Sequence, residues 1–385
     1  MLKILLREKR LAIQEEYAKL ERSREELREA YLRLLSNLSP EEILDILQED
    51  NGAVPQEPVQ HVILLGDAFT TQVEMKNWAA EELSKKVVIA VDGSQILTTG
   101  EFTIPLGFVQ AGAFWTEYTP EKGLYGKDFR SDIFVGSTAT EEREQSEPLH
   151  EMGVNMRRLA KEIDLALETI EKFRKRGVKA YLLLDGSIIF RFLNHASEEV
   201  KQAMCGDLVR LLHACEEKAI PVAGYVDHSF AKDITATLEK LLKKSYDIKV
   251  SDIAVVGPAL GEVGFGARTS VFRLKHDFLS RYYSEYANDM CFFYQKLHSG
   301  PPVRIEFPKW ICDAEAVQDL ARVVAAQAII GDGYPYVLLR AHETAFLESA
   351  NRDRFNTIVT WFLSEECKIP IRETVKAKMK RLSII

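Results

Sequence analysis

The sequence lacks the features that would place it in several common classes of protein. None of its five cysteines forms a Cys-x-x-Cys pair, which argues against a zinc ribbon or a disulfide framework and favours reduced thiols in the core. No run of about 18 apolar residues exists, and the chain starts with charges too early for a signal peptide. We therefore expect a cytoplasmic protein that does not contact a membrane.

The sequence also lacks an excess of positive charge and a phosphate-binding loop. Its net charge of −8 argues against binding nucleic acid by bulk charge, although a local basic groove or a partner that carries the nucleic acid is compatible with it. The Gly-rich segment 257–266 has neither the Lys-Ser/Thr ending of a P-loop nor a strand–helix frame, so we expect a loop without a nucleotide there. The apolar fraction of 46% allows a sizeable core.

The most informative feature that is present is an apolar run followed by Asp-Gly-Ser, which occurs twice. The first copy, 87–94, leads to Asp92, and the second, 181–187, leads to Asp185. Short runs rich in Val, Ile and Leu are typical of strands that are buried on both faces. An Asp-Gly pair between apolar runs is also a strong hairpin signal, and a single copy would favour a simple turn.

Because the phrase occurs twice, we favour a shared site over two separate turns. Two strand-end carboxylates from distant parts of a chain meet only if their strands are neighbours, and they then repel each other unless a cation lies between them. Hard oxygen ligands favour Mg²⁺ or Mn²⁺. We therefore predict a divalent metal site at the carboxyl ends of two adjacent strands.

A third carboxylate is expected from the helix predicted at 149–175, which runs antiparallel to the second strand. That strand rises roughly 20 Å to Asp185, and the same distance back along a helix takes about 13 residues, which leads to Glu162. Glu162 lies about 60° from the centre of the helix's apolar stripe, whereas Glu168 lies opposite the stripe. Glu151 is a weaker candidate, and a solvated position on the helix flank is the alternative for Glu162.

A later candidate pair is Tyr334 and His342, which stand on either side of a short apolar segment. A histidine in such a place could donate to a phosphate, act as a general acid or base, or bind metal. The tyrosine could orient a phosphate or stack on a base. A core tyrosine and a hydrogen-bonded core histidine are the alternative interpretation.

The rest of the chain predicts an α/β protein with a mixed sheet flanked by helices and an N-terminal helical arm. In the arm (1–50), an amphipathic helix packs on a partner, forms a short coiled coil or docks on its own domain. A linker with a short helical segment (51–84), a main domain (85–350) and a C-terminal helix with a basic tail (351–385) follow. Further strands are expected within 101–115 and at 220–226, 292–294 and 303–307, an edge strand or loops at 116–146, and helices at 197–218, 314–330 and 352–363.

With both Asp-Gly-Ser strands, the long helix between them and the late Tyr-Pro and Ala-His segments, the chain resembles the NurA nuclease family over roughly residues 85–350. The resemblance implies an RNase H-like core, a homodimer, and Mn²⁺- or Mg²⁺-dependent cleavage of single- and double-stranded DNA. It also implies 5'-3' exonuclease and single-strand endonuclease activity. The implied partner is the hexameric HerA ATPase, in the resection of double-strand break ends.

The resemblance also assigns roles to individual residues. Asp92 and Asp185 match the two metal-binding aspartates of the family, and Glu162 is the candidate for its metal-binding helix glutamate. Tyr334 and His342 match the late tyrosine and histidine of its catalytic site. All five are therefore expected in one catalytic centre.

One family feature fits only loosely, and two other functions stay open. Family members often carry a lysine after the strand that follows the second aspartate. Lys232 is the tentative nucleic-acid contact on this basis, although Asp227 and His228 before it depart from the pattern. The alternatives are a non-catalytic subunit that docks on a DNA-processing complex through its arm, and an RNase H-like nuclease that acts on RNA or junctions.

Overall fold

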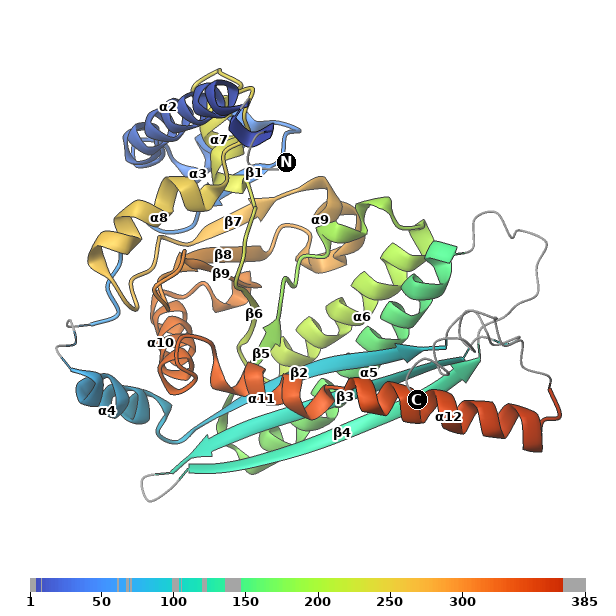
Figure 1. The fold of residues 1–385 in the computed structure, drawn as a ribbon. Helices are drawn as coiled ribbons and strands as arrows, with labels where there is room; N and C mark the ends of the chain where they lie inside the picture. The colour runs from blue at the N-terminus through green and yellow to red at the C-terminus, as the bar shows by residue number, and fades with distance from the viewer. Residues whose placement is uncertain are drawn as a thin grey trace.

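The computed structural model describes residues 5–7, 9–60, 62–66, 69, 71–98, 104, 106–119, 123–135 and 147–369. Within them a nine-stranded sheet runs through the molecule, and helices pack on both of its faces (Figure 1). In this part of the chain no helix combines the length and the hydropathy needed to cross a membrane. The predicted basic tail lies outside the described residues.

The sheet has the strand order β1-β7-β8-β9-β6-β5-β2-β3-β4. β2 pairs in parallel with β5 and β5 in parallel with β6, whereas the other neighbouring strands are antiparallel. One end of the sheet is therefore an antiparallel meander, β4-β3-β2, that continues into two parallel strands. The strands span Gly52–Pro55 (β1), Lys86–Leu97 (β2), Leu106–Tyr118 (β3), Gly123–Val135 (β4), Lys179–Asp185 (β5), Val222–Val226 (β6), Phe272–Lys275 (β7), Met290–Gln295 (β8) and Val303–Pro308 (β9).

Several helices begin where the sequence supplies a capping group. Ser39 and Thr71 each accept a hydrogen bond from the backbone N–H three residues on, and the glutamate there bonds back, which makes two capping boxes. The carboxylate of Asp313 caps the helix that follows it. The helices span Arg10–Leu35 (α2), Pro40–Leu47 (α3), Gln72–Leu83 (α4), Glu147–Arg176 (α5), Glu198–Glu217 (α6), Asp233–Leu241 (α7), Asp252–Val263 (α8), Asp277–Tyr282 (α9), Ala314–Ile330 (α10), Tyr336–Ala345 (α11) and Ser349–Trp361 (α12).

The central strands are apolar throughout because both of their faces are covered. Successive side chains of a strand point to opposite faces. In β2, Val87, Ile89 and Val91 pack in one core with α5 and α6, whereas Val88 and Ala90 pack in a second core with α10 and α11. This two-sided burial explains why the strand reads as a continuous apolar run rather than an alternating one.

Most expected elements are present, including the long helix α5 and the edge strand β4, but three predictions need correction. β2 does not end at Asp92; it continues to Leu97 because this half of the strand stays paired with β3. The segment 257–266 was wrongly expected to be a loop. Most of it belongs to α8, in which buried apolar side chains hold even Pro258 in a helix. The linker expected within 51–84 contributes strand β1, which pairs with β7.

Candidate active site

The two Asp-Gly-Ser copies lie side by side in the sheet. The parallel register of β2 and β5 runs up to the pair Val91–Leu184, so one more residue along each strand sets Asp92 beside Asp185. By the alternation of strand side chains, both aspartates project on the face covered by α10 and α11. The two carboxylates of the repeated phrase therefore meet at one point, as the sequence predicts.

Glu162 reaches this point from α5, on the opposite face of the sheet. The Glu162 side chain passes over Gly93, which leaves space for it because glycine has no side chain. A Cβ built on Gly93 would lie 2.0 Å from Glu162 Oε1. The distance argument from the sequence thus selects the helix residue that lies against the strand. Glu168 is exposed, as expected, and the side chain of Glu151 lies outside the described residues.

Two side chains from the C-terminal part of the chain hold the aspartates. Asp92 Oδ2 lies 2.8 Å from His342 Nδ1, and its other oxygen accepts the N–H of the following residue at 2.7 Å. The Tyr334 hydroxyl donates to Asp185 Oδ1 at 2.8 Å. The late Tyr and His therefore contact one aspartate each, and the structure brings all five expected catalytic residues together.

Glu162 is held in an environment that opposes its ionisation. Its side chain is only 17% exposed, and Arg158 Nη1 donates to it at 2.9 Å and to the carbonyl of Gly93 at 3.3 Å. Burial raises the pKa of Glu162 to about 7; Arg158 acts in the opposite direction, and the charges of Asp92 and Asp185 add to the rise. This carboxyl is therefore a group that needs a further positive charge to ionise easily.

The Asp185–Tyr334 contact is also shaped by burial and charge. Burial raises the pKa of Asp185, the hydrogen bond from Tyr334 opposes the rise, and the charge of Asp92 adds to it. Burial and then the charge of Asp185 raise the pKa of Tyr334 above its usual range. The phenol is thus a stable hydrogen-bond donor, and its ring is further fixed by an edge-on contact with Tyr225, at 5.0 Å between centroids.

Helix α11 brings His342 over Asp92 of β2. The helix buries Leu338 and Ala341 against the strands and leaves the side chain of His342 about half exposed, 55%. Its last turn comes close to β3 because Gly112 has no side chain; a Cβ there would lie 2.7 Å from the backbone nitrogen of Ala345. The short apolar segment noted in the sequence is therefore the buried face of a helix.

The turn after Asp185 is fixed by different means from the strand after Asp92. Gly186 has φ +92°, a conformation that favours glycine, and its carbonyl packs over β6 where Gly224 leaves room, 2.7 Å from a Cβ built there. Ser187 Oγ and the Ile188 N–H both donate to Glu306 on β9, at 2.6 and 3.1 Å. Glu306 thus anchors the turn that carries Asp185.

Glu306 itself belongs to a buried network of charges. Arg304 Nε donates to it at 2.7 Å, and Arg304 Nη1 donates to Asp233 at 2.7 Å. Arg191, four residues after the turn, donates to the same aspartate at 2.7 Å. Such buried pairs add little net stability but hold side chains in one arrangement, here next to the turn that follows β5.

The sequence interpretation missed Asp227, which follows β6. Its charge adds to the effect of burial in raising the pKa values of Asp185 and Tyr334, and its Oδ1 lies 3.2 Å from His298 Nε2. The signal was present, since this is a third apolar run that ends in an aspartate. Lys232 is exposed at the start of α7, and its side chain has no hydrogen bond or ion pair within the described residues.

The donor set suits a hard divalent cation. Asp92, Glu162 and Asp185 offer carboxylate oxygens, the ligands that Mg²⁺ and Mn²⁺ prefer, and burial, together with the charges of the two aspartates, raises the pKa of Glu162. Within the described residues no three acidic, His or Cys side chains are already arranged around one metal position, because each of these carboxylates turns to a protein partner. A bound metal ion would require Glu162 to turn away from Arg158.

Comparison with known proteins places the chain in a family. A family model described as the NurA domain matches residues 86–346. The fold is similar to the NurA nuclease from Sulfolobus solfataricus, with a TM-score of 0.46 and 16% identity over 73% of this chain and 85% of that one. It is also similar to a second NurA crystal structure (TM-score 0.39, 10% identity, 71% and 88% covered) and to NurA bound to dAMP and manganese (0.33, 12%, 69% and 86%). No curated protein matches the sequence.

Proposed function

Since the chain belongs to the NurA family, we propose that it is a nuclease that cleaves DNA with the help of a divalent cation. The observation that supports this most directly is the convergence of Asp92, Glu162 and Asp185, which come from two strands and a helix. Their repulsion opposes folding unless a cation joins them. Such an arrangement is typical of a functional site rather than of a structural core.

In this proposal the three carboxylates hold one or two Mn²⁺ or Mg²⁺ ions. When bound, the metal supplies an activated water and stabilises negative charge at the phosphate and at the leaving oxygen. Arg158 is released from Glu162 when that carboxylate turns toward the metal. Its guanidinium, about a third exposed at 31%, is then free to donate to a phosphate oxygen of the DNA.

Tyr334 and His342 orient the aspartates in this proposal. The phenol holds Oδ1 of Asp185, and the imidazole holds Oδ2 of Asp92, whose Oδ1 accepts the N–H of Gly93. With Nδ1 used in this way, the Nε2 atom of the half-exposed His342 ring faces the substrate side. It contacts the phosphate or transfers a proton.

We also propose that the core is RNase H-like. The support is the strand order β4-β3-β2-β5-β6, which, numbered along the chain from β2, reads 3-2-1-4-5. The first three strands are antiparallel and the last two are parallel to the first. This strand order supports the proposal of an RNase H-like sheet, in which the proposed catalytic aspartates lie on two adjacent parallel strands.

The proposed biological role is the resection of DNA double-strand break ends, with 5'-3' exonuclease and single-strand endonuclease activity, a second copy of the chain, and a HerA-like hexameric ATPase. Residues 85–350 form the nuclease domain in this proposal, and 1–50 form the contact arm. The second half of α2 is docked, since Leu27 and Tyr31 are buried, whereas Leu11 is 74% exposed. The exposed first half is therefore the part available to a partner.

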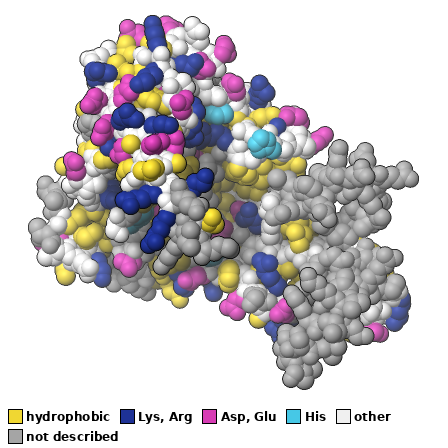
Figure 2. All heavy atoms as spheres, turned by 45° about the horizontal axis from the view of Figure 1, so that its top comes forward, with side chains coloured by type: hydrophobic (Ala, Val, Ile, Leu, Met, Phe, Trp, Pro, Cys, Tyr) yellow, Lys and Arg dark blue, Asp and Glu magenta, His cyan; other side chains and the backbone are white. Residues whose placement is uncertain are grey.

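Delivery by a partner also fits the charge of the molecule. On the face shown in Figure 2, Lys and Arg side chains are interspersed with Asp and Glu rather than gathered in one field, and the net charge is −8. DNA binding in this proposal relies on local contacts, among them the exposed Lys232, rather than on long-range attraction.

The test is digestion of end-labelled single- and double-stranded DNA in the presence of Mn²⁺ or Mg²⁺. We expect cleavage by the wild-type protein and by Asp164→Ala, which removes an exposed carboxylate of α5 that pairs with Arg210. Asp185→Ala should leave the fold intact and abolish cleavage. Full activity of Asp185→Ala would refute the proposed active site.

The two alternative functions are separated by the same assay. A non-catalytic subunit would show no cleavage by the wild-type protein and no Mn²⁺ binding that depends on Asp185. An enzyme for RNA or junctions would cleave matched RNA, hybrid or branched substrates faster than DNA. Leu11→Asp tests the arm: it should weaken binding to the ATPase and leave basal cleavage unchanged.

A further inference from the structure

A cavity of about 230 Å³ lies directly behind the three carboxylates, between the sheet, α5 and α6. Asp92, Glu162 and Asp185 line one end of it. The other end is apolar and is lined by Ala166, Phe190, Phe192, Met204, Leu208 and Leu211. The cavity therefore has a polar end at the proposed active site and an apolar end that extends away from it.

This cavity communicates with solvent. Phe192 is 65% exposed and the Arg158 side chain 31%, although both line the same cavity as the fully buried Leu211. An exposed Phe in the wall of a cavity is not explained by core packing. Aromatic rings in such positions stack on bases in proteins that bind single-stranded nucleic acid.

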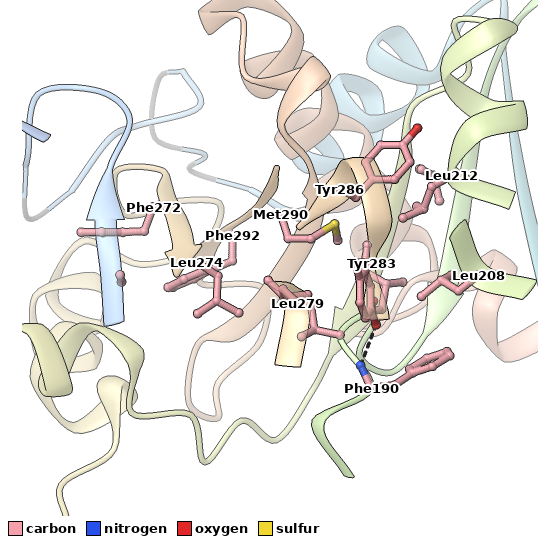
Figure 3. Close-up of a cluster of buried hydrophobic side chains, with 14 of the residues drawn as sticks. Phe190, Leu208, Leu212, Phe272, Leu274, Leu279, Tyr283, Tyr286, Met290 and Phe292 are labelled. Carbon is pink, nitrogen blue, oxygen red and sulfur yellow. Dashed lines mark hydrogen bonds between the residues drawn. The ribbon is translucent and has the colours of Figure 1, made fainter. Parts of the chain in front are cut away.

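The aromatic wall of the cavity is built rigidly. Figure 3 shows Tyr283 above Phe190, with its hydroxyl accepting the Phe190 N–H at 2.8 Å. The same hydroxyl donates to the carbonyl of Ile188 at 2.9 Å. The rings of Phe190 and Phe192 follow directly, with centroids 5.4 Å apart. The wall is thus tied to the turn after Asp185 and keeps a fixed position relative to the carboxylates.

The size of the cavity limits what it can hold. A cavity of about 150 Å³ is enough for benzene, whereas drug-sized ligands occupy pockets of about 300 Å³ or more. The volume here, about 230 Å³, suits one flat ring system. A nucleobase has this form, with apolar ring faces for the aromatic wall and a polar edge for Arg158 and Ser187 at the active-site end.

We propose that this cavity binds the base of the nucleotide next to the cleaved phosphodiester bond. The inference rests on the proposed nuclease function and deepens it, because only an unpaired and unstacked base can enter a space of this size. Single-stranded DNA and frayed ends are then the direct substrates. A strand that carries an abasic site at the cleaved position binds and reacts poorly, although its phosphates are unchanged.

Two variants and one control test the cavity. Ala166→Leu fills its floor with an apolar side chain, and Phe192→Ala removes the exposed ring. Phe230→Ala is the control, because Phe230 is a more exposed phenylalanine, 81%, that does not line the cavity. Retention of Mn²⁺-induced thermal stabilisation shows that the carboxylates are intact in each variant.

The first measurement is binding without cleavage. A short single strand that ends in 2-aminopurine is titrated with protein in EDTA, and fluorescence quenching by stacking is followed. We expect quenching with wild type and Phe230→Ala, and binding weaker by about five- to a hundredfold with Phe192→Ala or Ala166→Leu, since a base–aromatic stack contributes this range. Equal quenching in all four proteins would overturn the proposal, and Phe192→Ala, a surface change, keeps the test valid if Ala166→Leu does not fold.

The second measurement compares cleavage of an intact strand with cleavage of the same strand carrying an abasic site. Wild type and Phe230→Ala should prefer the intact strand, and both cavity variants should lose this preference while they retain activity at the abasic site. Equal rates on both strands with the wild-type protein would show that the cavity is only a packing void. Failure of the nuclease proposal gives a different result from failure of the cavity proposal, because the wild-type protein would then cleave neither strand with Mn²⁺ or with Mg²⁺.

Discussion

Replacing Glu162 by Gln is expected to stabilise the metal-free protein while it abolishes metal-dependent cleavage. Glu162 lies against Gly93 with 17% of its side chain exposed, and burial raises its pKa to about 7. Glutamine keeps the shape of the neutral acid and carries no charge. The substitution therefore removes a repulsion from the folded state without opening a cavity.

The magnitude follows from the pKa shift. The pKa of Glu162 is about 7 in the folded protein against an ordinary 4.5. With respect to this group, the free energy of unfolding of the wild-type protein is therefore highest below pH 4.5 and decreases as the pH rises through 7, whereas glutamine shows no such decrease. At about 1.4 kcal/mol per unit, the loss reaches about 3 kcal/mol at about pH 8. An unfolding entropy of about 2.1 cal/mol/K per residue converts this to a Tm increase of about 4 °C for Glu162→Gln.

The assay is thermal or urea unfolding of wild type and variant in EDTA at two pH values. The gain in stability of Glu162→Gln should be about 3 kcal/mol at about pH 8 and fall below about 1 kcal/mol at about pH 5, where the wild-type side chain is protonated in the folded protein. Glu168→Gln is the control; its exposed pair with Arg130 predicts a change within about 0.5 kcal/mol at both pH values. A gain that is absent at the higher pH, or equal at both, would refute the reasoning.

Three further outcomes are expected from the structure. Gly93→Ala places a methyl group where Glu162 Oε1 lies, so it should abolish cleavage and Mn²⁺ binding while the far-UV circular dichroism stays unchanged; wild-type activity would contradict the close contact. Glu306→Gln loosens the anchor of Ser187 and should weaken Mn²⁺ affinity by about tenfold in calorimetry, with little change in the affinity for DNA in EDTA. Burial opposes the ionisation of Asp319, but hydrogen bonds from two lysines and a tyrosine outweigh it and lower its pKa to about 2; Asp319→Asn should therefore cost about 2 kcal/mol in urea unfolding at neutral pH, a cost that persists above pH 3.8 and disappears as the pH falls through about 2.

The parts of the site that could be predicted from the sequence are those set by strand and helix geometry. Apolar runs buried on both faces identify the strands of Asp92 and Asp185, and the rise per residue of strand and helix selects Glu162 on α5. These quantities depend only on the regular backbone. They are therefore accessible before any packing is known.

The parts that could not be predicted depend on contacts between distant segments. Arg158 and Glu306 are ordinary charged residues in the sequence, and their roles appear only when α5 lies over β2 and β9 lies beside β6. The same holds for α8, where burial of apolar neighbours outweighs the helix-breaking tendency of Pro258. In each case the tertiary environment overrides or completes a weak local signal.

The two Asp-Gly-Ser copies have the same sequence, but each requires its glycine for a different structural reason. In the first copy the chain stays extended within β2, and Gly93 is required because Glu162 occupies the place of a side chain. In the second copy Gly186 is required because the chain turns with φ +92°. The turn interpretation thus applies to one copy and the close-approach interpretation to the other, and what both copies share is an aspartate at the same level of two adjacent parallel strands. Because only the position of the aspartate is common to the two, the repeat is explained by the proposed metal site and not by a shared backbone conformation.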